Sequence, residues 1–107
     1  MANWELTLKK IYLDQMRNGK KRLEVRVGYS KIKRIAAGDS IVFLSRDDEY
    51  QAHVKAVRNY KSFSEMLDVE DAGQIVPGKS KREVEKALKA IFPPNREAFG
   101  VYVFELD

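Results

Sequence analysis

The sequence contains no cysteine and only one histidine among its 107 residues. Without cysteine the chain can form neither a disulfide framework nor a thiolate zinc or iron–sulfur site. The single imidazole, His53, stands on an expected strand, where a packing or surface role is commoner than catalysis or metal binding. We therefore expect no metal and no other cofactor.

Long apolar runs are also absent. The longest are Ile41–Leu44 and Ala98–Phe104, both far shorter than the roughly 20 residues that a membrane helix requires. The first residues hold no apolar stretch of signal-peptide length. We therefore expect no membrane contact and a cytoplasmic location. The length of 107 residues is typical of one domain, so we expect a single domain over residues 1–107.

Positive charge, in contrast, is abundant and unevenly distributed. The net charge is +4, yet residues 1–40 hold ten Lys or Arg against four acids, whereas residues 41–107 hold ten against twelve. The window Arg17–Arg34 contains eight basic residues and one acid, Glu24. Such a local field attracts phosphate groups, because binding releases the counterions of a polyanion. The alternative is an ordinary solvated basic face.

The hydrophobic pattern predicts about five strands and three helices in the order β α β β β α α β. The strands are expected over Trp4–Leu8, Lys20–Val27, Ile41–Leu44, Tyr50–Tyr60 and Phe99–Leu106. The helices are expected over Leu8–Asn18, Ser62–Leu67 and Ser80–Phe92. Each of the last two opens on a Ser-x-x-Glu capping box, and Pro93-Pro94 ends the last helix. The segment Gly28–Ala37 is expected to be a basic loop with room for one short helical turn.

Short connections between the strands favour an α+β fold, a small, mainly antiparallel β-barrel with flanking helices. Closure of the barrel would leave no free strand edge. Along the longest strand, one face is expected to carry Ala52, Val54 and Ala56, and the other His53, Lys55 and Val57.

The strongest candidate site is a basic segment that begins at the end of the first helix. Gly19 ends that helix, and Lys20 and Lys21 follow. The next strand presents Arg22, Glu24 and Arg26 on one face. These side chains form either an ion ladder on the surface or the polar floor of a cleft. In a cleft, Glu24 would orient Arg26 or accept from a base edge, and Lys21 would bind phosphate or position a proton.

Further candidates lie outside this segment. Basic residues expected to steer phosphate groups are Lys20, Arg22, Lys31, Lys33 and Arg34. Tyr29 and Tyr60 are candidates for stacking on a base. Ser62 most simply caps a helix, but its hydroxyl is also a candidate for the cleft. The aromatic residues expected in the core are Trp4, Phe43, Phe63, Phe92, Phe99 and Phe104.

The motif Gly19-Lys20-Lys21-x-x-Glu24-x-Arg26, followed by Ile35-x-x-Gly38-Asp39-x-Ile41-x-Phe43, resembles the ASCH domain family. Residues 54–67 and 99–105 are similar to that family's strand-then-helix segment and closing strand. The resemblance implies a PUA-like small β-barrel that acts as an RNA- or nucleotide-binding module. The family's cleft motif corresponds here to Gly19, Lys21, Glu24 and Arg26.

One branch of the family suggests a second function beside RNA binding. The proteins of that branch look like acetylcytidine amidohydrolases that use a Lys, a Thr and a later Glu. Lys21 matches the Lys, Glu24 stands at the Thr position, and residues 70–78 align only loosely with the later Glu. Amide hydrolysis would then need water activated by Glu24 or Lys21. Ribonuclease activity is also suggested for some members, and a Lys/Arg cluster can stabilise a pentavalent phosphate. The alternative function is therefore hydrolysis through Lys21, Glu24 and water.

Overall fold

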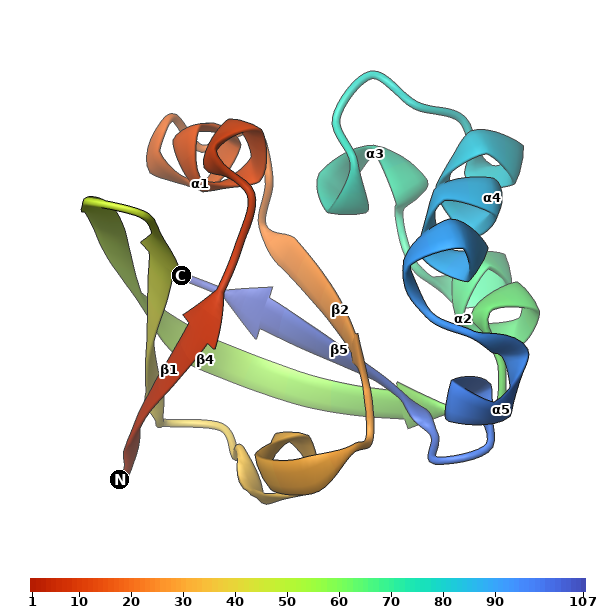
Figure 1. The fold of residues 1–107 in the computed structure, drawn as a ribbon, viewed down its shortest axis with the longest axis horizontal. Helices are drawn as coiled ribbons and strands as arrows, with labels where there is room; N and C mark the ends of the chain where they lie inside the picture. The colour runs from red at the N-terminus through yellow and green to blue at the C-terminus, as the bar shows by residue number, and fades with distance from the viewer.

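The computed structural model describes residues 1–107 and contains one five-stranded sheet curled into a half-barrel (Figure 1). Its strands are β1 (Asn3–Thr7), β2 (Leu23–Val27), β3 (Ser40–Ser45), β4 (Asp48–Tyr60) and β5 (Val101–Leu106). They lie in the order β1-β3-β4-β5-β2. β1 and β3 are parallel and the other three pairs are antiparallel. The predicted α+β, mainly antiparallel architecture is confirmed.

We expected the barrel to close, but it stays open. β1 and β2 form the two edges of the sheet and are not paired with each other. Side chains satisfy the free carbonyl groups of β1 instead. Arg26 Nη2 donates to the Thr7 carbonyl at 2.7 Å, and Lys31 Nζ donates to the Glu5 carbonyl at 2.6 Å. Backbone acceptors at a free edge need such partners. The seam between β1 and β2 is therefore crossed by two cationic side chains.

The helices are α1 (Lys10–Arg17), the 3-10 helix η1 (Ser30–Arg34), α2 (Phe63–Val69), α3 (Ala72–Ile75), α4 (Lys81–Ile91) and α5 (Pro94–Glu97). The capping box at Ser80 and Glu83 is present, and Ser62 accepts a hydrogen bond from the Glu65 amide. α3 and α5 were not predicted, because four residues are too few to show a helical period. No helix combines the length and hydropathy that crossing a membrane requires.

The two faces of the sheet pack into two separate cores. Inside the half-barrel, Phe104 and Leu106 of β5 pack with Leu13 and Met16 of α1. On the other face, the alternate β5 residues Val101 and Val103 pack against α2, α3 and α4. The strand period of two sends successive side chains to opposite faces. The sheet thus separates α1 from the α2–α4 layer, as Figure 1 shows.

The alternation predicted along β4 is correct only for its first half. Ala52 and Val54 are buried in the half-barrel, and His53 and Lys55 are exposed. A β-bulge between Val54 and Ala56 then shifts the register against β5. Beyond it, Val57 packs against the interior core, not Ala56 as expected. One extra residue in a strand reverses the faces of the residues that follow it.

Candidate functional site

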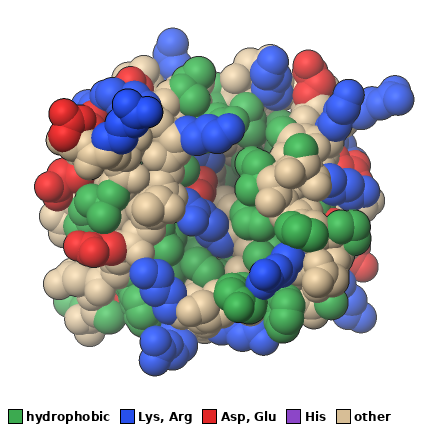
Figure 2. All heavy atoms as spheres, in the orientation of Figure 1, with side chains coloured by type: hydrophobic (Ala, Val, Ile, Leu, Met, Phe, Trp, Pro, Cys, Tyr) green, Lys and Arg blue, Asp and Glu red, His purple; other side chains and the backbone are tan.

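A pocket of about 460 Å³ lies between the half-barrel and helices α3 and α4. Figure 2 shows it as the hollow at the centre of the molecule, with basic and hydrophobic side chains on its walls. Its lining residues are Thr7, Leu8, Lys9, Tyr12, Lys21, Glu24, Val25, Arg26, Ile75, Val76, Ala87, Leu88, Ile91 and Phe92. The volume is within the roughly 300–1,000 Å³ typical of small-molecule sites.

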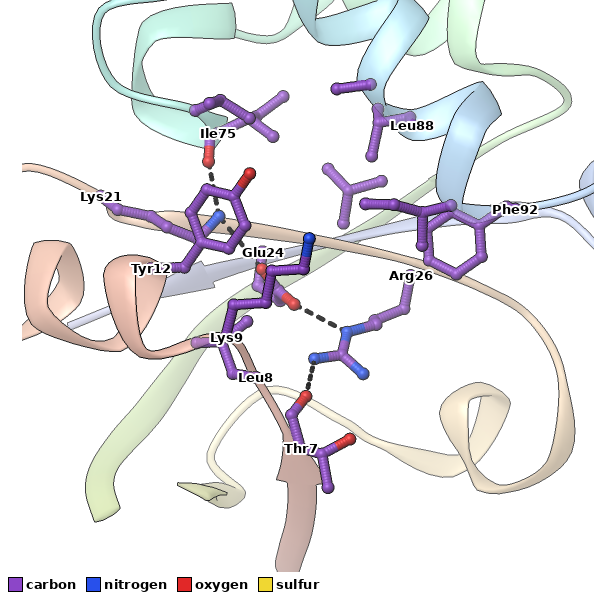
Figure 3. Close-up of a pocket in the computed structure, with 14 residues that line it drawn as sticks. Thr7, Leu8, Lys9, Tyr12, Lys21, Glu24, Arg26, Ile75, Leu88 and Phe92 are labelled. Atoms are coloured by element: carbon purple, nitrogen blue, oxygen red, sulfur yellow. Dashed lines mark hydrogen bonds and ion pairs between the residues drawn. The ribbon is translucent and has the colours of Figure 1, made fainter. Parts of the chain in front are cut away.

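The polar floor of the pocket is made by Lys21, Glu24 and Arg26 (Figure 3). Lys21 Nζ and Glu24 Oε1 are 3.0 Å apart, and their side chains are only 3% and 7% exposed. Arg26 Nε donates to Glu24 Oε2 at 2.7 Å. Glu24 and Arg26 share a face because they alternate on β2, while Lys21 reaches the same place from the residues before the strand. We call these three residues the triad; Lys21 and Glu24 are buried, and Arg26 is partly exposed.

The polar groups of the triad are largely satisfied by contacts within the chain. Lys21 Nζ also donates to the carbonyls of Leu23 and Ile75, both at 2.6 Å, so its three N–H groups have three acceptors. Burial raises the pKa of Glu24, but the charges of Lys21 and Arg26 outweigh it and hold that pKa below its ordinary value. Arg26 Nη1 makes no hydrogen bond inside the chain. Every other side-chain nitrogen of the triad makes at least one.

The remaining walls differ sharply in character. Lys9 extends into the pocket from the residue before α1, and no hydrogen bond or ion pair engages its ammonium group (Figure 3). The opposite wall is apolar and comes mainly from α4 and the residues beside it: Val76, Ala87, Leu88, Ile91 and Phe92. The pocket therefore combines a cationic side with an apolar side.

The other residues of the predicted basic segment do not line the pocket. Gly19 adopts φ +82° after α1, a left-handed conformation that favours glycine. That turn lets the amides of Lys20 and Lys21 donate to the Gln15 carbonyl at 2.9 and 3.0 Å, and so directs Lys21 inward. Lys20 and Arg22 are exposed.

The four candidates that follow β2 lie apart from the pocket. Tyr29 is 52% exposed, and Arg96 lies over its ring at 4.2 Å. Lys31 is bound to the β1 edge and Arg34 lies over the Trp4 ring at 5.6 Å, while Lys33 is exposed. The expectation that Phe99 belongs to the core was wrong, because it is 43% exposed and packs edge-on against Tyr29 at 5.6 Å.

Tyr60 and Ser62 also lie outside the pocket. Ser62 caps α2. Tyr60 donates its hydroxyl hydrogen to Glu70, whose side chain is only 6% exposed and accepts two further bonds from Arg58, at 2.6 and 2.9 Å. Although burial raises the pKa of Glu70, Arg58 and Tyr60 hold it below its ordinary value. This group ties the end of α2 to the sheet.

Replacing Tyr60 with phenylalanine is expected to cost about 1.5 kcal/mol of unfolding free energy, because Glu70 loses a hydrogen bond to a charged acceptor. Urea unfolding measures this loss. A titration with single-stranded RNA should show unchanged affinity, because Tyr60 does not line the pocket. A tenfold loss of RNA affinity with unchanged stability would instead assign Tyr60 to the binding surface.

Sequence reasoning missed the pocket residues that come from other elements. Thr7, Lys9 and Tyr12 lie around the junction of β1 and α1, where a predicted strand and helix meet without any polar motif. Ala87, Leu88 and Ile91 form an apolar stripe at helical spacing, a pattern typical of a helix face that packs against a core. No sequence signal separates this stripe from an ordinary packing face; only the structure shows that Ile91 remains 52% exposed.

A family model of the ASCH domain matches residues 6–106, a range that contains every residue lining the pocket. The chain belongs to the ASCH domain family. No curated protein matches this ASCH domain.

Solved structures resemble this ASCH domain along almost its whole length. The crystal structure of hypothetical protein PH0355 has a TM-score of 0.89 and 34% identity, covering 98% of this chain and 97% of that one. The solution structure of PF0455 from Pyrococcus furiosus has a TM-score of 0.79 and 32% identity, covering 98% and 96%. A mutant of ZmASCH from Zymomonas mobilis, at 17% identity and a TM-score of 0.65, covers 96% of this chain and 66% of that one, and shares the fold.

Proposed function

We propose that this ASCH domain binds RNA or nucleotides in the pocket between the half-barrel and α4. The observation that carries the proposal is the convergence of Lys21, Glu24 and Arg26 in one pocket, opposite the apolar wall of α4. A nucleotide has matching parts, since its base has an apolar face and a polar edge and its phosphate is anionic. Unpaired bases are recognised in this way, by packing of the face and hydrogen bonds to the edge.

The polar groups of the triad suit a base edge. Each oxygen of Glu24 pairs with one cation, at 3.0 Å to Lys21 and 2.7 Å to Arg26. A carboxylate offers about four lone-pair sites, so Glu24 retains acceptor capacity for an exocyclic amine. Arg26 Nη1 has N–H groups to donate to a carbonyl or phosphate. Glu24 and Arg26 thus present a hydrogen-bond acceptor beside a hydrogen-bond donor.

The charges of the triad favour binding over the alternative, hydrolysis of an acetylcytidine amide or of RNA. Lys21 has no lone pair to act as a base while its three N–H groups bond to Leu23, Ile75 and Glu24. Glu24, with its pKa held below the ordinary value, is a weak base for activating water. Release of cytidine from acetylcytidine, or cleavage of a mixed RNA, would make the hydrolase the better account.

A titration of fluorescent single-stranded RNA of mixed sequence tests the binding function. If the two pocket cations that retain free N–H groups, Lys9 and Arg26, each contact a phosphate, log affinity should fall with log salt at a slope of about −1.4. Arg26→Gln should weaken binding by roughly 10- to 100-fold, because a charge-assisted contact is lost.

The matched control is Arg46→Gln, which removes the same charge from an exposed turn that does not line the pocket. It should change affinity less than about threefold, the effect of net charge alone. Equal losses in the two variants, or a slope near zero, would contradict binding in the pocket.

A further inference from the structure

We infer that the ligand of this pocket is a phosphorylated nucleotide rather than a free nucleoside, an inference that rests on the proposed function. Its phosphate is bound by Lys9 together with Arg26 Nη1. Lys9 was not among the residues that the sequence singled out. The inference follows from which cations of the pocket are engaged and which are free.

Lys21 is not available for this role. Its ammonium group already contacts the carbonyls of Leu23 and Ile75 and the carboxylate of Glu24, and its side chain is 3% exposed. An ammonium group has three N–H donors, so a phosphate would have to displace one of these partners. Lys21 instead fixes β2 to α3 and holds Glu24 in place.

Lys9 is in the opposite situation. It lines the pocket with no hydrogen bond or ion pair, and Figure 3 draws no interaction to its nitrogen. The next residue, Lys10, provides the contrast, because its ammonium group is held by Asp14 at 2.9 Å and Asp48 at 2.6 Å. Both lysines are exposed, but they differ in their partners: Lys10 is paired with two acids, whereas Lys9 points toward the pocket and is paired with none.

The charge of the pocket calls for an anion. Glu24 is its one acid and is already paired with both Lys21 and Arg26, so these three residues carry a formal charge of +1. Lys9 adds a second positive charge, and the α4 wall contributes none. A phosphomonoester carries about −1.5 to −2 at pH 7, which matches this excess, whereas a nucleoside carries no charge.

The two free donors lie at the same end of the pocket. Arg26 Nη2 is fixed to the Thr7 carbonyl at 2.7 Å, which holds the guanidinium beside the segment from Thr7 to Lys9. The apolar side chains of Leu88 and Phe92 lie on the opposite wall (Figure 3). A nucleotide would therefore lie with its phosphate toward the β1–α1 junction and its base against α4.

Calorimetric titration at low salt tests this inference, with the four nucleoside 5′-monophosphates, the four matching nucleosides and inorganic phosphate as probes. At least one monophosphate should bind the unmodified protein ten times more tightly than its nucleoside, and more tightly than inorganic phosphate. Lys9→Ala should weaken monophosphate binding by roughly 10- to 100-fold and leave nucleoside binding unchanged. Lys9→Arg should retain most of the affinity.

The matched control is Lys86→Ala, which removes an exposed lysine of α4 that does not line the pocket and should change affinity less than twofold. Equal binding of monophosphate and nucleoside, with no effect of Lys9→Ala, would overturn the phosphate site but leave the pocket as a nucleoside site. If no monophosphate binds, the inference fails. If RNA also fails to bind, the proposed function fails with it.

Discussion

Replacing Glu24 with glutamine is expected to lower the free energy of unfolding by about 3–5 kcal/mol, the usual cost of leaving a buried charge without its partner. Lys21 and Glu24 are 3% and 7% exposed, so water in the pocket replaces the lost carboxylate only in part. Arg26 loses its 2.7 Å partner in the same step. Because small domains are stable by only about 5–15 kcal/mol, this one change would remove a large part of the total.

The effect of the substitution should depend on pH. Although burial raises the pKa of Glu24, Lys21 and Arg26 hold it below its ordinary value of 4.5, so the folded state favours the ionised form. A carboxylate with a lowered pKa stabilises the fold fully above its unfolded pKa and loses that contribution as pH falls. The difference between wild type and Glu24→Gln should therefore be largest at neutral pH and shrink below about pH 4.5.

Urea unfolding at pH 7 and at about pH 3.5 measures both effects. Glu49→Gln is the control, because Glu49 is exposed and its carboxylate forms no ion pair. It should change stability by no more than about 0.5 kcal/mol. A loss below about 1 kcal/mol for Glu24→Gln, or a difference that does not vary with pH, would show that the triad is not electrostatically coupled.

The second large effect is expected from filling the pocket. Ala87 lines it from α4, so Ala87→Trp would place an indole where the ligand is proposed to lie. RNA affinity should fall by at least about 100-fold, because the base loses its apolar wall and its space. The fold should persist, since tryptophan costs an α-helix at most about 0.7 kcal/mol relative to alanine.

Ala90→Trp gives a matched control on the same helix. Ala90 is exposed and does not line the pocket, so its replacement adds the same side chain to the outer surface of α4. RNA affinity should then change less than about twofold, with both variants compared by thermal unfolding and RNA titration. Wild-type affinity in Ala87→Trp would place the RNA elsewhere, for example along the exposed residues near Tyr29.

The elements that could be predicted are those with local signals. Ser80 and Glu83 mark the start of α4 because a capping box depends on residues three apart. The alternation of Glu24 and Arg26 on β2 predicts that they share a face. Their assembly with Lys21 in a pocket was one of two interpretations, and only the placement of α3 and α4 over β2 distinguishes a pocket floor from an exposed ion ladder.

What could not be predicted depends on contacts between distant segments or on irregular backbone. Lys9 and Phe92 line the same pocket because the fold brings their segments together, and nothing in either segment indicates this. The bulge at Val54 and Ala56 breaks an alternation that the sequence continues without a mark. Tyr60 resembles a stacking residue in sequence but is engaged by Glu70, an acid whose partner could not be assigned from spacing.

Amide chemical shifts recorded during a titration with single-stranded RNA test the central claim most directly, since they locate the ligand on the folded chain. We predict that the largest changes fall on residues that line the pocket, namely 7–9, 24–26, 87, 88, 91 and 92. Residues 29–34 and 60–62, which lie outside it, should change little. Shifts confined to those outer residues, or no shifts at all, would contradict a nucleotide site between the half-barrel and α4.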